Sequence, residues 1–464
     1  MLPQPLALKS FLGSAGRSPG RLRCLLTALL LCGFAQAAVA GDAELSQEDR
    51  IAELERKLEI LSDELEKTRV ESALPELMLE GKNGFGPAAS KVYDIGRGIS
   101  IGGYAEGRYV GHVTDQDTTT NRSDAYRGVL YVGYKYNDWI VFNSETEVEH
   151  ASTSKGGSVS LEFAALDFLL DDALNARIGL LLSPMGFINE VHEPPFYYGN
   201  FRPEAERRII PTTWRENGFG IFGSFLEDTL SYRMYALNGF NAEGFTDAGL
   251  RGGRQKGSKA LAEDFAFVGR VDWTPIPALD LGASVYVGDS GQDQTNVKKD
   301  EAGAIIFERA IPNAQTTIWE VHAQYRSRGL FLRGLFTQAH VADSGQLNFA
   351  LDKDADDAIA SRMYGGYVEA AYNIMPLIAP DSQMSVEPFY RYEFINTQAS
   401  VSSGPAGGPV GGYTENKTQD NRLHVLGVNF KPIPQVVLKL DYRNREAKEG
   451  SLSNEISVGA GLVF

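Results

Sequence analysis

Basic and acidic side chains gather at residues 183–216, a stretch whose residue types suit the binding of a charged solute. Its arginines are Arg202, Arg207, Arg208 and Arg215. A guanidinium group can hold an oxyanion through two parallel hydrogen bonds, so these arginines predict a site for an anionic solute. The alternative is that they pair with Glu204, Glu206 and other carboxylates and fix the stretch in place. The sequence leaves both interpretations open.

Charged residues alternate with apolar ones along three further segments, residues 139–149, 384–396 and 436–445. A period of two places the charged members of each segment on one face of a β-strand. We expect these faces to line a water-filled interior that the stretch 183–216 narrows. The charged residues predicted to contribute to this pore are Glu145, Glu147, Glu149, Arg391 and Arg443.

The elements that must position these residues are strands joined by alternately short and long connections. The short connections contain Asn, Asp, Gly or Pro, which favour tight turns, and the long ones are polar. The pattern predicts an all-β fold, a sixteen-stranded antiparallel transmembrane barrel with an even strand number. The predicted strands are 99–113, 125–136, 139–149, 158–170, 174–182, 218–225, 230–238, 265–273, 279–287, 316–326, 330–341, 362–374, 384–396, 422–430, 436–445 and 456–464.

The two ends of the chain favour a barrel in a bacterial outer membrane over a soluble sandwich, which would bury its apolar faces. In the last predicted strand, apolar residues alternate with small ones up to Phe464, and a terminal Phe resembles the C-terminal signal of outer-membrane proteins. Residues 1–40 are predicted to be a signal peptide, with a basic start, a short apolar core and an Ala38-Val39-Ala40 cleavage site. Both cysteines lie in that segment, so the mature chain is expected to have no thiol chemistry.

The segment after the signal peptide has a heptad pattern. Ile51, Leu54, Leu58, Leu61 and Leu65 recur at spacings of three and four, which predicts a coiled-coil helix within residues 41–72. A single amphipathic helix docked on the barrel is the alternative. We expect a linker at residues 73–91, the barrel at 92–464, and the helix on the periplasmic side, where the short turns lie.

Composition excludes some partners and leaves the solute open. The formal net charge is −16, and loss of the four basic and no acidic residues of the signal peptide would make it −20. This charge argues against nucleic acid as a partner. It does not decide ion selectivity, which depends on the few charges at the narrowest point of a channel.

Enzymatic and metal chemistry have little support. Gly288-Asp289-Ser290-Gly291 imitates a serine-hydrolase motif without the strand–turn–helix context of such enzymes. Acidic residues at 352–357 imitate the start of a calcium loop, but the bidentate Glu at position twelve is replaced by Met363. Loose binding of divalent ions at the outer surface stays open. We expect no catalytic activity, no cofactor and no metal site.

The overall plan resembles the phosphate-selective porin O/P family. The resemblance is carried by the run Arg177 to Phe187, with its Gly, Pro and Phe, and by the runs 207–214 and 218–221, which resemble the re-entry into the next strand. It covers most of the barrel and implies a trimeric passive channel for small ions. It implies anion selectivity only if basic residues line the pore, and the three inward glutamates oppose that.

Two functions from different classes therefore follow from the sequence. The first is an outer-membrane porin, a homotrimer surrounded by outer-membrane lipid and lipopolysaccharide, through which small hydrophilic solutes or ions diffuse. These solutes include anions such as phosphate, with residues 183–216 as the constriction. The second is a structural envelope protein that uses its periplasmic coiled coil to tether the outer membrane to peptidoglycan or a partner. Conductance in planar bilayers would separate them.

Overall fold

The computed structural model describes residues 53–62, 81–113, 120–154 and 156–464. The chain divides into two compact units, residues 1–68 and 69–464. The predicted signal peptide and most of the predicted coiled coil lie outside the described residues. Among the described residues, no helix is both long and apolar enough to cross a membrane.

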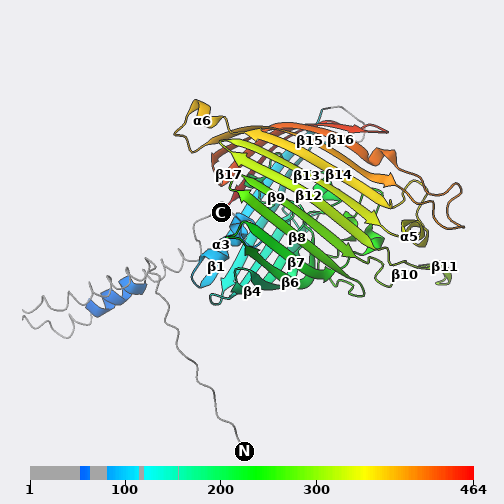
Figure 1. Ribbon diagram of the computed structural model, residues 1–464, viewed down its shortest axis with the longest axis horizontal. Helices are drawn as coiled ribbons and strands as arrows, with labels where there is room; N and C mark the ends of the chain where they lie inside the picture. The colour runs from blue at the N-terminus through cyan, green and yellow to red at the C-terminus, as the bar shows by residue number, and fades with distance from the viewer. Residues whose placement is uncertain (1–52, 63–80, 114–119, 155) are drawn as a thin grey trace, which may run out of the picture. The chain divides into compact units, whose positions relative to one another are not determined.

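The second unit contains a closed antiparallel barrel of sixteen strands (Figure 1). Its first and last strands, β1 and β18, pair from Tyr104 with Val463 to His112 with Glu455 and so complete the ring. The strands are β1 (Gly98–His112), β2 (Arg122–Lys135), β3 (Ile140–Glu149), β4 (Ser158–Asp171), β5 (Leu174–Leu182), β6 (Arg215–Phe225), β7 (Leu230–Asn238), β8 (Phe265–Ile276), β9 (Leu279–Gly288), β12 (Thr316–Ser327), β13 (Leu330–Val341), β14 (Arg362–Tyr372), β15 (Ser385–Ser400), β16 (Asp420–Ile433), β17 (Val436–Ala447) and β18 (Glu455–Val463).

These strands confirm the predicted fold class and strand number. Inward and outward residues alternate along the strands, with register shifts between β1 and β2, between β3 and β4, and between β14 and β15. In β17, Lys439, Asp441 and Arg443 are buried toward the interior, whereas Leu438 and Leu440 are exposed on the outer surface. The long connections nevertheless contain structure that the pattern did not predict. Strands β10 (Thr295–Lys299) and β11 (Ile305–Ala310) form a separate hairpin between β9 and β12.

The short helical elements lie at the ends of the barrel and inside it. They are α3 (Pro87–Asp94), η1 (Pro194–Phe196), α4 (Ala205–Arg208), η2 (Ala242–Gly244), η3 (Arg251–Gly253), α5 (Ser344–Ala350), α6 (Met375–Ile378) and η4 (Lys417–Gln419). In Figure 1, α5, β10 and β11 mark the end of the barrel with the long loops, and the C-terminus and α6 lie toward the opposite end, where the short turns are.

Helix α3 lies against the inner wall of the barrel, where the sequence had indicated the end of a linker and the start of a strand region. It packs on β1, β2 and β3. Asn143 of β3 donates its side-chain amide to the carbonyl of Ala89 at 2.8 Å, and Tyr93 donates its hydroxyl to Asp167 of β4 at 2.6 Å. Residues 87–94 therefore fill part of the lumen beside β1 to β4.

The first unit contributes one described segment, a helix over residues 53–62 that lies within the predicted coiled coil. Its Leu54, Leu58 and Leu61 side chains are 60%, 66% and 60% exposed. Glu53 pairs with Arg56 at 3.2 Å and with Lys57 at 3.3 Å, the spacing that stabilises a single helix turn. Because residues 54–62 are all exposed, the predicted seam and self-association through it stay predictions.

Candidate pore constriction

Residues 183–214, here called the inserted loop, leave the wall after β5 and return to it at β6. Hydrogen bonds close the neck of the loop: the Ser183 N–H donates to the Trp214 carbonyl at 2.9 Å. The Asn189 side chain donates to both the Ser183 and Trp214 carbonyls and accepts from the Trp214 N–H at 2.7 Å. The loop thus enters the lumen as a fixed element, and β6 begins at Arg215, so the last two residues of the predicted loop belong to this strand.

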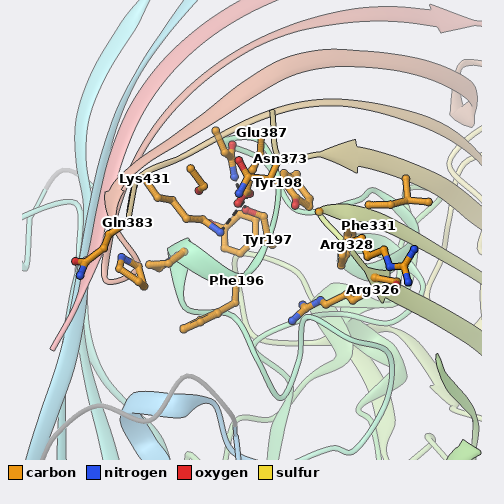
Figure 2. A pocket seen from close by; sticks show the side chains of 17 residues that line it. Phe196, Tyr197, Tyr198, Arg326, Arg328, Phe331, Asn373, Gln383, Glu387 and Lys431 are labelled. Atoms are coloured by element: carbon orange, nitrogen blue, oxygen red, sulfur yellow. Dashed lines mark hydrogen bonds and ion pairs between the residues drawn. The ribbon is translucent and has the colours of Figure 1, made fainter. Parts of the chain in front are cut away.

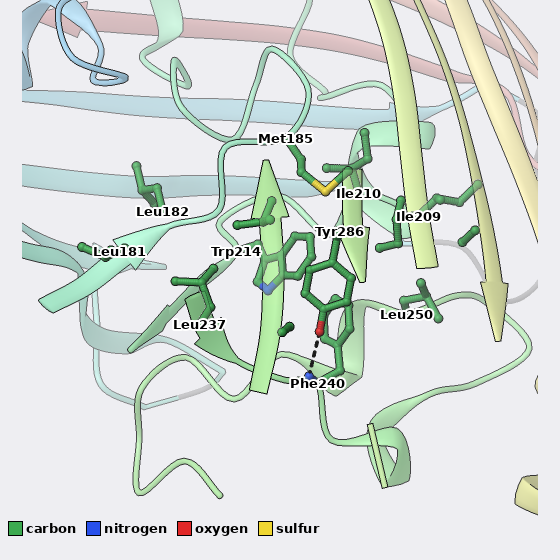
Figure 3. Packing of buried hydrophobic residues seen from close by; sticks show 14 of the residues in the cluster. Leu181, Leu182, Met185, Ile209, Ile210, Trp214, Leu237, Phe240, Leu250 and Tyr286 are labelled. Atoms are coloured by element: carbon green, nitrogen blue, oxygen red, sulfur yellow. Dashed lines mark hydrogen bonds between the residues drawn. The ribbon is translucent and has the colours of Figure 1, made fainter. Parts of the chain in front are cut away.

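Near its neck the inserted loop packs into an apolar core within the barrel (Figure 3). The Trp214 ring stacks on Phe240 with centroids 4.5 Å apart and contacts Tyr286 at 4.9 Å. Met185 and Ile210, both fully buried, belong to the same core. Because this core excludes water beside β5 to β9, the open part of the lumen must lie elsewhere.

The middle of the inserted loop, residues 194–208, is here called the crossing segment because it reaches the opposite wall. Arg391 of β15 donates to the carbonyls of Tyr198 and Phe201, both at 3.0 Å. Lys439 of β17 donates to the carbonyls of Tyr197 at 3.0 Å and Gly199 at 2.8 Å. Buried cations from strands far away in the sequence thus hold backbone oxygens and fix the path of the segment.

Several predicted site residues serve this anchoring through ion pairs. Arg391 also pairs with Glu369 at 2.9 Å and with Glu393 at 2.8 Å. Buried arginines bound to carboxylates on both sides are held tightly, since loss of either partner would leave an unpaired buried charge. Arg391 therefore anchors the crossing segment and does not offer a free guanidinium group to a solute.

Arg443 and Arg215 are engaged in the same way. Arg443 pairs with Glu455 at 2.8 Å and with Glu204 of the crossing segment at 3.2 Å. Arg215 pairs with Glu162 of β4 at 2.6 Å. For these two arginines, the geometry favours the anchoring interpretation that the sequence had left open.

Glu145 and Glu147 of β3 are buried on the inner face of the barrel, and His192 of the inserted loop lies beside Glu145. Glu145 and Glu147 are 0% and 2% exposed. Glu147 pairs with Arg127 of β2 at 3.1 Å, and the Glu145 carboxylate lies 3.2 Å from Nε2 of His192 in the inserted loop. The acidic strand therefore does not present these two carboxylates to the open lumen.

Glu149 and His192 complete this wall. The Ser158 hydroxyl donates to Glu149 at 3.3 Å, at the loop end of β3. Burial, together with the positive charges of Arg202 and Arg127, lowers the pKa of His192 to about 3, so its ring is neutral. Arg202 lies in this region, and its Nη2 is buried without a hydrogen-bond partner in the described part of the chain.

The crossing segment separates two cavities at opposite ends of the lumen. One, at the end with the long loops, has a volume of about 400 Å³ and is lined by Glu204, Arg207 and Arg208 among others. The other, at the end with the short turns, has a volume of about 490 Å³ and is lined in part by residues 195–198 (Figure 2). We call them the loop-end vestibule and the turn-end vestibule.

The loop-end vestibule carries an excess of positive charge. Its ionisable lining residues are Glu204, Arg207, Arg208, Arg251 and Arg445. Arg207, whose side chain is 48% exposed, pairs with Glu204 at 2.6 Å. Burial raises the pKa of Glu204, but Arg207 and Arg443 outweigh it and bring that pKa to about 2. Arg208 contacts neutral acceptors, the Ala248 carbonyl at 2.8 Å, the Thr397 hydroxyl at 3.1 Å and the Gln419 side chain.

Two arginines of the connection between β7 and β8 extend this basic surface, and the sequence had not singled them out. Arg251 donates to the Thr212 carbonyl at 2.6 Å, and Arg254 donates to the Thr212 and Thr213 carbonyls at 2.7 and 2.9 Å. Burial and neighbouring arginines lower the pKa of Arg251 to about 10 and that of Arg254 to about 9. The sequence signal available was two arginines in the glycine-rich run 249–254.

The other motifs considered for chemistry have structural roles. Ser290 is fully buried and its hydroxyl donates to Thr316 at 2.9 Å. Asp352, in the acidic run 352–357, pairs with Lys298 at 2.6 Å. Within the described ranges, no group of three or more His, Cys, Asp or Glu residues is arranged to hold a metal ion.

Comparison with known sequences finds a relative in the bacterium Aquifex aeolicus (strain VF5), an uncharacterized protein. It is 35% identical over 395 residues, which cover 82% of this chain and 84% of the relative. The chain belongs to the family of this Aquifex protein. No family model matches the sequence. The expected resemblance to the phosphate-selective porin O/P family therefore stays a prediction.

Solved structures with a similar fold are bacterial porins. The Salmonella typhi OmpF complex with daunomycin aligns with a TM-score of 0.51 at 14% identity, covering 80% of this chain and 98% of OmpF. An anion-selective porin from Comamonas acidovorans aligns with a TM-score of 0.45 at 12% identity, covering 79% and 99%. The OmpF alignment, together with the closed ring of sixteen strands, shows a porin-type barrel fold.

Proposed function

We propose that this protein is an outer-membrane channel through which small hydrophilic anions diffuse passively, with the inserted loop as its constriction. A sixteen-stranded barrel is wide enough to leave an aqueous lumen, whereas an eight-stranded one fills with side chains. The outward residues of the barrel are apolar, as in Leu438 and Leu440, which suits a wall in contact with lipid.

The observation that carries the proposal is the charge of the two vestibules on either side of the crossing segment. Four arginines and one glutamate line the loop-end vestibule. Two arginines, one lysine and one glutamate line the turn-end vestibule. An anion therefore meets a net positive surface on both sides, although the whole chain is acidic.

The test is conductance and reversal potential of the full-length protein in planar bilayers under a potassium chloride gradient. We expect open current and a reversal potential of the sign that chloride permeation gives. In the variant pair Arg207→Gln with Arg251→Gln, selectivity should shift toward cations. Arg422→Gln is the matched control, because Arg422 is exposed between the buried Asn421 and Leu423 and so faces away from the lumen.

Assembly and location are part of the same proposal. The leucine row of helix 53–62 supports a homotrimer joined in part by a periplasmic coiled coil, after removal of residues 1–40 as a signal peptide. Chemical cross-linking of the protein in outer-membrane vesicles should give trimers. Replacing Leu54 and Leu58 by Glu should weaken those trimers without unfolding the barrel.

A structural envelope role is the second candidate function, and two observations favour it. The inserted loop, the apolar core and α3 fill much of the lumen, and the exposed leucine row offers a surface for a periplasmic partner. A barrel that passes no current at any salt concentration, but whose helix binds peptidoglycan or an envelope protein, would replace the channel proposal with this one.

A further inference from the structure

The turn-end vestibule has an aromatic wall in addition to its charge. Phe196, Tyr197 and Tyr198 of the crossing segment and Phe331 of β13 line this cavity of about 490 Å³. The Tyr198 ring lies with its centroid 5.0 Å from that of Phe331 and 5.4 Å from that of Phe389. Tyr198, Phe331 and Phe389 thus form an aromatic cluster, and Phe196 and Tyr197 line the same cavity.

A free guanidinium group lies next to this surface. Arg326, at the end of β12, is exposed to the vestibule, and its guanidinium carbon lies 5.1 Å from the Phe331 ring centroid. Lys431 is neutralised by Glu387 at 3.3 Å, whereas Arg326 and Arg328 form no ion pair with any carboxylate of the described residues. Figure 2 shows Arg326 and Phe196 extending into the same space from different sides.

The aromatic wall is held in place before any ligand arrives. Phe196 ends the short helix η1, which begins with Pro194 and Pro195. The carbonyl of Tyr197 accepts hydrogen bonds from Asn429 at 3.2 Å and Lys439 at 3.0 Å, and Arg391 holds the carbonyl of Tyr198. A preformed surface loses little conformational entropy when it binds, so contacts with a flat ligand translate more directly into affinity.

We infer that the turn-end vestibule binds aromatic carboxylates. The ring of the ligand would lie against Phe196, Tyr198 and Phe331, and its carboxylate would accept two hydrogen bonds from the Arg326 guanidinium. The volume lies within the range usual for small-molecule sites, roughly 300–1,000 Å³. Inorganic anions would use only the guanidinium and leave the aromatic wall exposed to water, so the site favours the larger ligand.

This inference names a solute class for the proposed channel, but binding itself does not require passage. The test is isothermal titration of the full-length protein in detergent micelles with benzoate, cyclohexanecarboxylate, acetate and inorganic phosphate, with empty micelles as the blank. We expect benzoate to bind about tenfold more tightly than acetate, the gain expected when an aromatic pair adds to area burial. Cyclohexanecarboxylate should fall between them.

Variants separate the two halves of the site. Arg326→Gln should weaken benzoate binding about tenfold, the usual effect of losing a charge-assisted bidentate contact, and Arg326→Lys should restore part of it. Phe196→Leu should weaken benzoate binding and leave acetate unchanged. Arg422→Gln, on the outer surface, should change neither. The difference in electrophoretic mobility between heated and unheated samples of each variant checks that the barrel is folded.

Equal affinity for benzoate, acetate and phosphate would overturn the inference, because it would show a simple anion site. So would a folded Arg326→Gln or Phe196→Leu variant that binds benzoate like the Arg422→Gln control. Bilayer conductance of the same preparation in potassium chloride keeps the two proposals apart. Benzoate binding without current would overturn the channel alone, and current without benzoate binding would overturn this site alone.

Discussion

Removing two positive charges from the loop-end vestibule should reduce anion preference by a predictable amount. Arg207 and Arg251 line this cavity, and the Arg251 guanidinium group donates to the backbone carbonyls of Arg207 and Thr212. Replacing both by Gln keeps the side chains polar while changing four positive charges against one negative to two against one. Because Arg207 also pairs with Glu204, the substitution leaves that carboxylate with Arg443 as its ion-pair partner.

The magnitude follows from simple electrostatics. An anion about 8 Å from one guanidinium group is stabilised by about 0.5 kcal/mol of electrostatic free energy in water. At about 0.1 M salt, the Debye length of roughly 10 Å reduces this by about half, so two charges contribute about 0.5 kcal/mol. An anion loses this energy and a cation gains it, so the anion-to-cation permeability ratio should fall about fivefold.

The assay is the reversal potential in a potassium chloride gradient, measured near 0.1 M and repeated near 1 M salt. At the higher concentration the Debye length is roughly 3 Å, and the difference between variant and wild type should nearly vanish. An unchanged permeability ratio at 0.1 M, with Arg422→Gln also unchanged, would refute the reasoning, because it would mean that permeating ions do not pass these arginines.

Three further predictions concern the inserted loop and α3. Arg391→Met should leave the carboxylates of Glu369 and Glu393 buried and without their arginine partner. The free energy of unfolding, measured by urea denaturation, should fall by about 3–5 kcal/mol. A loss below about 1 kcal/mol would show that Arg391 does not anchor the loop. Trp214→Ala should lower the free energy of unfolding by about 3–5 kcal/mol in the same assay, because the fully buried ring stacks on its neighbours. A variant as stable as the wild type, with no more noise in its channel current, would argue that the apolar core does not support the inserted loop. Burial raises the pKa of Glu193, which accepts the Ala88 N–H of α3 at 3.0 Å, to about 8. The contribution of this carboxyl group to the free energy of unfolding is therefore complete below about pH 4.5 and is lost as the pH rises through about 8. The melting temperature should fall over that pH range in the wild type and less in Glu193→Gln, and parallel curves would contradict this assignment.

The strands could be predicted because each repeats a local pattern. The predicted bounds of β5 and β13 match the structure at both ends, since alternation and turn residues mark where each strand begins and ends. Helix α3 has no comparable signal: its eight residues are small or polar, and its burial depends on the inner face of β1 to β3.

The role of each arginine could be predicted only in part, because its partner belongs to another strand. Arg443 meets Glu204 across 239 positions of sequence, and Arg391 meets the Tyr198 carbonyl across 193. The alternation of charged and apolar residues predicted that these arginines would face the interior. The sequence could not predict that Arg391 and Arg443 anchor the crossing segment while Arg251 and Arg326 stay free of carboxylates. These roles depend on how the loops fold into the lumen.

We propose that ions pass between two positively charged vestibules on either side of the crossing segment. Single-channel recording of the full-length protein in planar bilayers, with a potassium chloride gradient near 0.1 M, tests it most directly. The proposal predicts discrete open currents and a reversal potential displaced toward the chloride equilibrium potential. The absence of current across all salt concentrations, or a displacement toward the potassium equilibrium potential, would contradict it.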